Sequence, residues 1–336
     1  MSVAVSTKLT SLLNVTSPII SAPMTDATTP ALVAAVINAG GFGFLGSGRS
    51  SAAKIVADID EARALVAPEK QHLVGVGFVG WALDRTDPTT VKTVLAKNVA
   101  AVLFAYGRDL RKYVAEVREF DAAHEHKTLV FVTVNTVEEA SRVAKEWKPD
   151  VLVVQGYEAG GRANVNSPST KDFLQLVAET IPDHPLLVSA GGITKGSQIA
   201  ELLETGAAGL SEAKQLLIEA GADSTARSPI FDVIFPDNVW PDGIQARCLK
   251  TGIVTYEARV AELTAKQSES AKEELETLKA QLRTKIDSDK DYPLIYAGLG
   301  VAELKSIQPA FDVARGLHDE TVEALRSLNS ELLGGA

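Results

Sequence analysis

The stretch from Asp150 to Asn164 combines residue types that could hold a bound ligand. Its β-branched, apolar first part is bounded by turn residues, which predicts a buried strand. Gln155 stands where that strand ends, so its amide can donate and accept hydrogen bonds across the strand tips. Gly160 and Gly161 have no Cβ atom and therefore let the backbone come close to a ligand. Arg162 follows them, and because arginine stays protonated it can attract an anion but cannot act as a general base.

Two other turns have comparable properties. Ala22-Pro23-Met24 ends the first apolar run of the chain, and Gly191-Gly192 ends a later one. A helix is expected soon after this glycine pair, from 197 to 205. A glycine turn followed by a helix N-terminus offers backbone N–H groups and a positive dipole end to an anion.

Strands and helices alternate through the first two thirds of the chain. The expected strands cover 18–24, 42–46, 73–79, 100–106, 128–134, 151–154 and 186–190, and the expected helices cover 31–39, 50–67, 88–97, 110–124, 137–147, 171–180 and 197–205. Strict alternation implies a parallel sheet with crossover helices, and so many consecutive units favour an α/β fold of the TIM (β/α)8-type barrel over an open sheet. The glycine-rich and polar turns then share the barrel face where active sites lie.

The eighth strand of this barrel is expected to be missing or shortened. After Gly206-Ala-Ala-Gly-Leu210, the residues from Ser211 to Ile218 predict a helix with Ser211 as its N-cap. The barrel would then have an irregular closure or a gap between its first and seventh strands.

The last third of the sequence differs from the barrel part. Residues 223–252 carry three prolines and are expected to be irregular. Residues 257–291 are rich in charge, and their narrow apolar stripe predicts one long helix. A helix that covers the barrel is favoured over a coiled coil with a partner, since the heptads are few. A closing helix is expected over 307–328. The expected organisation is a barrel over 1–222, a helical lid over 223–293 and a segment returning to the barrel over 294–336.

Composition restricts the class of protein. The 336 residues include 33 basic and 43 acidic ones, and the net charge of −10 opposes binding to nucleic acid or to an acidic membrane surface. The single cysteine, Cys248, excludes an internal disulfide framework and fits a reducing compartment. With no signal peptide and no apolar run of membrane-spanning length, the expected location is cytoplasmic. The five histidines show no metal-ligand spacing, so no metal site is expected.

Three stretches, taken in order, resemble the FMN-dependent nitronate monooxygenases, formerly called 2-nitropropane dioxygenases. They are Ala22-Pro23-Met24 with PALVAAVINAGGFGFLGSG at 30–48, QGYEAGG at 155–161 and SAGGI at 189–193. The segment YAGLGVAELKSIQPA at 296–310 is similar to the family's C-terminal segment. The resemblance implies a TIM barrel with a smaller helical lid, which binds FMN at the carboxyl-terminal mouth and oxidises alkyl nitronates with dioxygen to a carbonyl compound and nitrite. The implied partners are a small nitronate or nitroalkane and dioxygen, and a homo-oligomer stays open.

The resemblance also implies which residues contact the flavin. They are Ala22, Pro23, Met24, Gly77, Gln155, Gly160, Gly161, Gly191 and Gly192. The first three would lie beside the isoalloxazine ring, Gln155 would hydrogen-bond the flavin, and the last two would help hold its phosphate. Gly77 stands where many members of the family have an asparagine facing the flavin.

Two departures from the family's pattern bear on activity. The family commonly has a histidine after the paired glycines, as the base that takes a proton from a neutral nitroalkane, and Arg162 stands there. Arg162 either attracts an anionic nitronate, in which case nitronates are preferred over neutral nitroalkanes, or only forms a salt bridge at the rim. The family's Gly-Thr phosphate loop after the eighth strand is absent or drastically shortened.

Two alternatives to nitronate oxidation follow from these features. A flavin-dependent enoyl reductase shares the motifs, but would need a nicotinamide donor and a place for an acyl carrier. A family member with an impaired FMN site would be a binding or non-catalytic protein, which Arg162 and the shortened eighth strand favour. Bound flavin would distinguish a nitronate monooxygenase from a non-catalytic family member. Consumption of reduced nicotinamide would distinguish an enoyl reductase from a nitronate monooxygenase.

Overall fold

A closed barrel of eight parallel strands forms the larger part of the computed structural model, which describes residues 3–25, 27–212, 220, 223–235, 239–266, 268–329 and 331–333. Around the barrel the strands are β1 (Ile19–Ser21), β2 (Phe42–Gly46), β3 (Val74–Val79), β4 (Ala101–Ala105), β5 (Leu129–Val134), β6 (Val151–Gln155), β8 (Leu186–Ala190) and β9 (Gly209–Glu212). The TIM-type barrel expected from the alternation of elements is confirmed.

The eighth barrel strand, β9, is present and short. Its backbone pairs in parallel with β8 on one side and with β1 on the other, so the barrel closes without a gap. The prediction that Ser211 begins a helix is wrong, because Ser211 pairs with Ala190 and with Ile20. An open barrel edge would leave backbone groups unpaired, and closure therefore outweighs the local N-cap pattern. The rest of the predicted helix, 213–218, lies outside the described residues.

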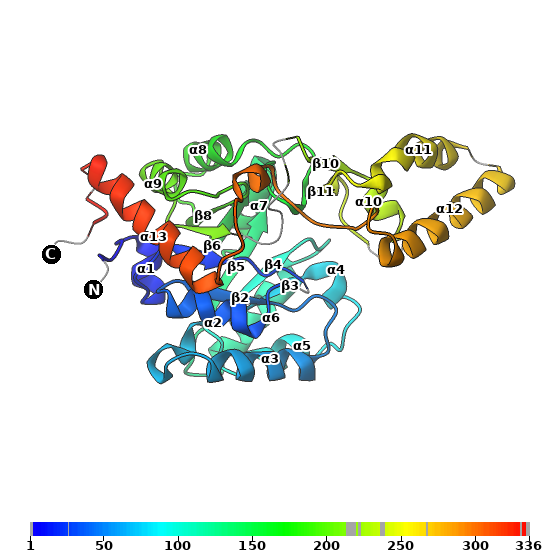
Figure 1. The fold of residues 1–336 in the computed structure, drawn as a ribbon. Helices are drawn as coiled ribbons and strands as arrows, with labels where there is room; N and C mark the ends of the chain where they lie inside the picture. Colours follow the sequence, from blue (N-terminus) through cyan, green and yellow to red (C-terminus); the bar gives the residue numbers. More distant parts are fainter. Residues whose placement is uncertain are drawn as a thin grey trace.

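Helices surround the barrel (Figure 1). They are α2 (Pro30–Asn38), α3 (Ala52–Ala64), α5 (Thr90–Leu95), α6 (Arg111–Ala122), α7 (Val137–Glu146), α8 (Thr170–Thr180) and α9 (Gly196–Glu204), with the short α1 (Lys8–Leu13), α4 (Gly80–Leu83) and η1 (Pro68–Leu73). The C-terminal helix α13 (Ala310–Ser327) packs against both α9 and α2. It therefore takes the position of the eighth barrel helix, although it comes from the far end of the chain.

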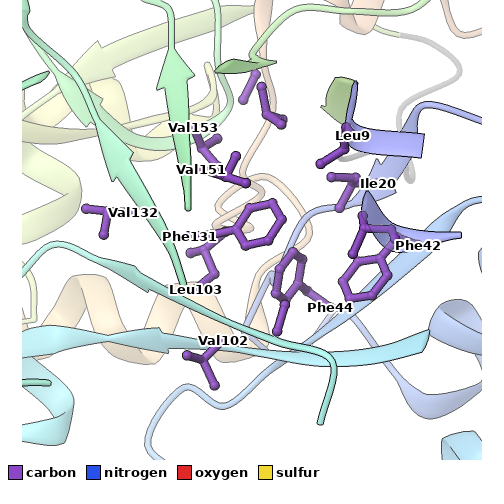
Figure 2. Close-up of a cluster of buried hydrophobic side chains, with 14 of the residues drawn as sticks. Leu9, Ile20, Phe42, Phe44, Val102, Leu103, Phe131, Val132, Val151 and Val153 are labelled. Carbon is purple, nitrogen blue, oxygen red and sulfur yellow. The ribbon is translucent and has the colours of Figure 1, made fainter. Parts of the chain in front are cut away.

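The barrel interior is filled by apolar side chains, as in other closed barrels. Figure 2 shows the rings of Phe42, Phe44 and Phe131 grouped within this cluster. Phe44 meets the other two edge to face, with ring centroids 5.0 and 5.2 Å away. Such packing leaves binding functions to the loops at the barrel ends.

A second, three-stranded antiparallel sheet adjoins the barrel mouth. Its order is β10 (Thr225–Ser228), β11 (Ile244–Leu249) and β7 (Gly161–Asn164). Residues 223–252, which we expected to be irregular, thus contain two strands and the short helix α10 (Ile230–Val233). β7 begins inside the glycine stretch that follows β6, so the turn expected there becomes an edge of this sheet.

Two helices extend away from the barrel on the far side of the small sheet (Figure 1). They are α11 (Glu257–Ala265) and α12 (Glu269–Ser288), and the single long helix expected over 257–291 is therefore wrong. Ser268 begins α12 as an N-cap that accepts a hydrogen bond from the Ala271 N–H. The short turns η2 (Gly252–Tyr256) and η3 (Leu299–Glu303) flank this unit. Across the described residues, no helix has both the length and the apolar character needed to cross a membrane.

Candidate active site

The residues with candidate functions follow the barrel strands at one face of the barrel. Ala22-Pro23-Met24 follows β1, Gln155 ends β6, and Gly191-Gly192 follows β8. Because all eight strands are parallel, these positions lie at the carboxyl-terminal mouth. The turns after β6 and β8 touch each other, since a Cβ atom built on Gly192 would lie 2.6 Å from the Cβ of Glu158.

The Ala22-Pro23-Met24 turn lies against β3. A Cβ atom built on Gly77 would lie 2.2 Å from the Cβ and 2.3 Å from the Cγ of Pro23. Gly77 therefore lets Pro23 pack against the end of β3, which gives a packing reason for glycine where many members of the resembled family have an asparagine. Contact of these residues with a flavin stays a prediction.

Gln155 is held at the mouth through its amide oxygen. The oxygen accepts hydrogen bonds from the Tyr106 hydroxyl at 2.7 Å and from the Asn135 Nδ2 at 3.0 Å. The amide nitrogen of Gln155 makes no hydrogen bond with the described residues, so its two N–H groups are left for a ligand. An acceptor atom of a ligand, rather than a donor, fits this arrangement.

Tyr106 and Asn135 are site residues that the sequence analysis missed. Each directly follows a barrel strand, β4 and β5, and this position was the available signal. Tyr106 has a φ of +56°, which is uncommon for a residue other than glycine and is often found at functional sites. Burial raises the pKa of Tyr106, so the phenol stays protonated and remains a donor.

The turn after β6 is covered by the C-terminal segment. A Cβ atom built on Gly160 would lie 2.5 Å from the backbone nitrogen of Gly298, and the Leu299 N–H donates to the Glu158 carbonyl at 2.9 Å. Gly160 thus lets another segment of the chain approach closely. Its predicted role of letting the flavin pass stays a prediction.

Gly191 and Gly192 form a turn with free backbone donors. Their φ values are +110° and +69°, and the N–H groups of both and of Ile193 donate no hydrogen bond to the described residues. Consecutive amides in such a turn make a concave site for an anion. At the start of α9, the Gly196 N–H donates to Glu320 and the Lys195 N–H before it donates to Gln198, so these two amides are already used. The glycine turn itself is therefore a better place for an anion than these two amides.

Arg162 is buried, with 7% of its surface exposed. Its guanidinium forms an ion pair with Asp232, donates to the Tyr296 hydroxyl at 3.2 Å and lies 4.3 Å from the centroid of the Trp240 ring. Its backbone carbonyl accepts the other hydrogen bond of Tyr106, at 2.7 Å. Arg162 therefore links β7 to α10 and to the C-terminal segment, and it is not free at the rim.

Two further arginines hold the turn that carries the glycines. Arg227 on β10 donates to the Ala159 carbonyl at 2.8 Å, and Arg247 on β11 donates to the Tyr157 carbonyl at 3.2 Å. The two residues are direct cross-strand partners. Burial and the neighbouring Arg247 lower the pKa of Arg227 to about 10. Their positive charges stabilise the turn through its carbonyl oxygens, a role that no local sequence motif indicates.

Aromatic rings complete the mouth. Trp81, in the short helix α4 after β3, meets Trp240 edge to face with ring centroids 5.2 Å apart, and Trp240 meets Tyr106 at 5.6 Å. Among the described residues, no group of three or more histidine, cysteine, aspartate or glutamate side chains could hold a metal ion. The mouth thus offers rings, backbone amides and a carboxamide nitrogen as its binding groups.

Known sequences match nearly the whole chain. A family model described as nitronate monooxygenase matches residues 6–320. The nitronate monooxygenase npaC of Metarhizium robertsii is 31% identical over 263 residues, which are 69% of this chain and 72% of the relative. A nitronate monooxygenase of Pseudomonas aeruginosa is 31% identical over 268 residues, covering 66% of this chain and 73% of the relative.

Solved structures agree with these matches. The nitroalkane oxidase of Streptomyces ansochromogenes is 25% identical, with a TM-score of 0.72 over 95% of this chain and 99% of its own. FabK of Thermotoga maritima is 23% identical, with a TM-score of 0.73 over 97% of this chain and 99% of its own, a likeness that concerns the fold alone.

Proposed function

The chain belongs to the nitronate monooxygenase family, and from this premise we propose that it oxidises alkyl nitronates with dioxygen to a carbonyl compound and nitrite. The family match over residues 6–320 is the observation that carries this function. The likeness to a nitroalkane oxidase over 95% of the chain supports it, since both proteins would act on a carbon next to a nitro-type nitrogen.

We propose FMN as the cofactor, held at the carboxyl-terminal mouth. Two observations fit this group. The unpaired amide nitrogen of Gln155 matches the acceptor atoms of an isoalloxazine ring, and the free N–H groups of Gly191 and Gly192 match a phosphate. The turn Ala22-Pro23-Met24 would lie beside the ring, and Gly160 and Gly161 would border it.

Bound FMN would supply the redox chemistry of this reaction. The chain's own residues then bind and orient the substrate and surround it with rings. Arg162 cannot take a proton from carbon, and its charge is paired with Asp232. The substrate consistent with this site is the nitronate, which has already lost that proton.

The test uses the purified full chain loaded with FMN and then desalted. Flavin absorption bands that stay with the protein, followed by oxygen uptake and nitrite release on addition of propyl-1-nitronate, are the expected result. A protein that takes up no FMN would overturn the proposal and favour a non-catalytic family member. Bound flavin with consumption of NADH and an enoyl thioester, but no oxygen uptake with the nitronate, would favour an enoyl reductase.

Two variants locate the flavin. Gln155→Ala removes the unpaired amide and is expected to weaken FMN binding by about tenfold, the size of one or two hydrogen bonds. Gln175→Ala is the matched control, because Gln175 is exposed on α8 and its side chain bonds, among the described residues, only to Glu179 in the same helix, at 2.8 Å. Equal FMN affinity in the two variants would remove Gln155 from the flavin site.

A further inference from the structure

The turn at Gly191-Gly192 contains three successive peptide groups whose two ends are used differently. The N–H groups of Gly191, Gly192 and Ile193 make no hydrogen bond with the described residues. The carbonyls of the same three peptides each face another part of the chain, and the first, on Ala190, accepts from the Gly156 N–H at 2.9 Å. In a trans peptide the C=O and N–H bonds point in opposite directions, so the groups that hold these carbonyls also aim the amides.

The second carbonyl, on Gly191, is held by Thr170. This threonine begins α8 and is 6% exposed. Its hydroxyl lies 2.9 Å from the Gly191 carbonyl and 2.8 Å from the Glu158 carboxylate, and it shares its single proton between them. Glu158 also accepts from the Thr170 N–H at 2.9 Å, whereas no other described residue donates to the Gly191 carbonyl. The Thr170 hydroxyl therefore orients the peptide that carries the Gly192 N–H.

The third carbonyl, on Gly192, lies against the C-terminal segment. We call residues 297–303 the strap, because they cross from the turn after β6 to the turn after β8. A Cβ atom built on Gly300 would lie 3.1 Å from the Gly192 carbonyl oxygen, so the strap backbone is in close contact with this peptide. The Leu299 N–H donates to the Glu158 carbonyl at 2.9 Å and fixes the other side of the strap.

The groups that hold the three carbonyls form one wall on the same side of the turn. A Cβ atom built on Gly156 would lie 2.2 Å from the Thr170 hydroxyl oxygen. Glu158 bonds to Thr170 through its side chain and to Leu299 of the strap through its backbone. The carbonyls therefore face this wall, and the three free amides face away from it.

We propose that Thr170 and the strap are positioning elements, which hold these three amides ready for the phosphate of FMN and make the site select a flavin phosphate over riboflavin. This inference rests on the proposed function, because it takes the cofactor to be a flavin. Donors that are already oriented lose little freedom on binding, and their hydrogen bonds to a phosphate are charge-assisted. Riboflavin ends in a neutral hydroxyl and gains less from the same donors.

The test compares the dissociation constants of FMN and riboflavin, measured by flavin fluorescence with the purified full chain. The parent protein is expected to bind FMN at least about a hundredfold more tightly, the size of two charge-assisted hydrogen bonds. Thr170→Val removes the hydroxyl and keeps a branched side chain. The FMN constant should then rise about tenfold, while the riboflavin constant changes by less than about twofold.

Two threonine variants are the controls for this measurement. Thr170→Ser keeps the hydroxyl and should retain the parent preference for FMN. Thr205→Val removes a hydroxyl that donates to the Glu201 carbonyl at 2.8 Å, at the far end of α9. It should leave both dissociation constants unchanged.

Gly300→Ala tests the strap without touching Thr170, so it decides the question if Thr170→Val does not fold. Gly300 does not have a positive φ, and the added methyl group acts only by pushing the strap away from the Gly192 carbonyl. The FMN constant should rise about fivefold or more, with little change for riboflavin. Gly316→Ala is the matched control, because a Cβ atom built on Gly316 in α13 meets nothing within 4 Å.

The outcomes separate this inference from the proposed activity. Equal affinity of the parent protein for FMN and riboflavin would overturn the inference, as would equal losses of both flavins in Thr170→Val and Gly300→Ala, which would indicate a general effect on the fold. Uptake of neither flavin would overturn the inference together with the proposed cofactor. The expected preference for FMN without oxygen uptake on addition of propyl-1-nitronate would support the inference and overturn only the activity.

Discussion

Arg162 on β7 is ion-paired with Asp232 on α10, so the residue at the expected catalytic position is joined to the small sheet's helix. The side chains are 6% and 20% exposed, and the pair is therefore largely removed from water. The same guanidinium stacks on Trp240 and bonds to Tyr296. The position of Arg162 after the paired glycines suggested a catalytic role. Its contacts indicate instead that it fixes the geometry of the barrel mouth.

Breaking this ion pair is expected to destabilise the fold. Arg162→Met or Asp232→Asn should each lower the free energy of unfolding by about 3 kcal/mol, because the remaining charge is left buried without a partner. The double variant should lose less than the sum of the two. Urea unfolding measures this. Lys171→Met is the control, since its pair with Glu201 is exposed and should contribute at most about 1 kcal/mol. Additive losses would show that the two charges do not interact.

The absence of a base at position 162 predicts a preference for one form of the substrate. General-base catalysis typically contributes a factor of about 10²–10⁴, so a freshly dissolved neutral nitroalkane should react at least about a hundredfold more slowly than its preformed nitronate. Initial rates of oxygen uptake near neutral pH, before the two forms equilibrate, give this ratio. Equal rates for the two forms would mean that another group in the site removes the proton.

The barrel was predictable because its signals are local. Each barrel strand from β2 to β8 is a short apolar run bounded by glycine or polar residues, and Thr29-Pro30 marks the start of α2, where Thr29 accepts from the Leu32 N–H as an N-cap should. The eighth strand lacks such a local signal. β9 has only four residues, and it is stabilised by β8 and β1 from distant parts of the chain rather than by its own composition.

The contacts that shape the mouth were not predictable, because they join distant residues. β7 pairs with β11 across a long separation, and nothing near Arg162 in sequence indicates Asp232. The apolar spacing of 257–291 continues through the break between α11 and α12, so periodicity alone could not show that the chain folds back there. Val260 and Leu282, from the two helices, share one apolar cluster.

Acid is expected to weaken the attachment of α13. His318 is 1% exposed, and its Nε2 bonds to the Val3 carbonyl at 2.9 Å. Burial lowers the pKa of His318, so the unfolded chain binds a proton more readily than the folded one. The contribution of neutral His318 to the free energy of unfolding is fully present above the ordinary histidine pKa of about 6.5. It is lost as the pH falls below that value, at up to about 1.4 kcal/mol per pH unit.

The comparison variant for this effect is His318→Gln, which has no titrating group. Free energies of unfolding in urea, measured between pH 8 and pH 5, should fall more steeply for the parent protein than for the variant. Parallel curves would assign the acid sensitivity to other groups.

Removing the Tyr106 hydroxyl should weaken flavin binding and lower stability, whereas removing an exposed tyrosine hydroxyl should not. Tyr106→Phe deletes the hydrogen bonds to the Gln155 amide oxygen and the Arg162 carbonyl, both 2.7 Å long. We expect the FMN dissociation constant to rise about tenfold and the free energy of unfolding to fall by about 1–2 kcal/mol. Tyr113→Phe is the matched control, because the Tyr113 hydroxyl bonds to Asp84 in an exposed pair at 2.8 Å.

The pH dependence of FMN binding provides a second check on Tyr106. Because burial raises its pKa, the phenol should remain a donor to Gln155 at pH 10, where an ordinary tyrosine is half ionised. FMN affinity in the parent protein should therefore not weaken through loss of this proton between pH 8 and pH 10. A drop over that range that is absent from Tyr106→Phe would show that the phenol ionises and that Gln155 is held less firmly than its two hydrogen bonds imply.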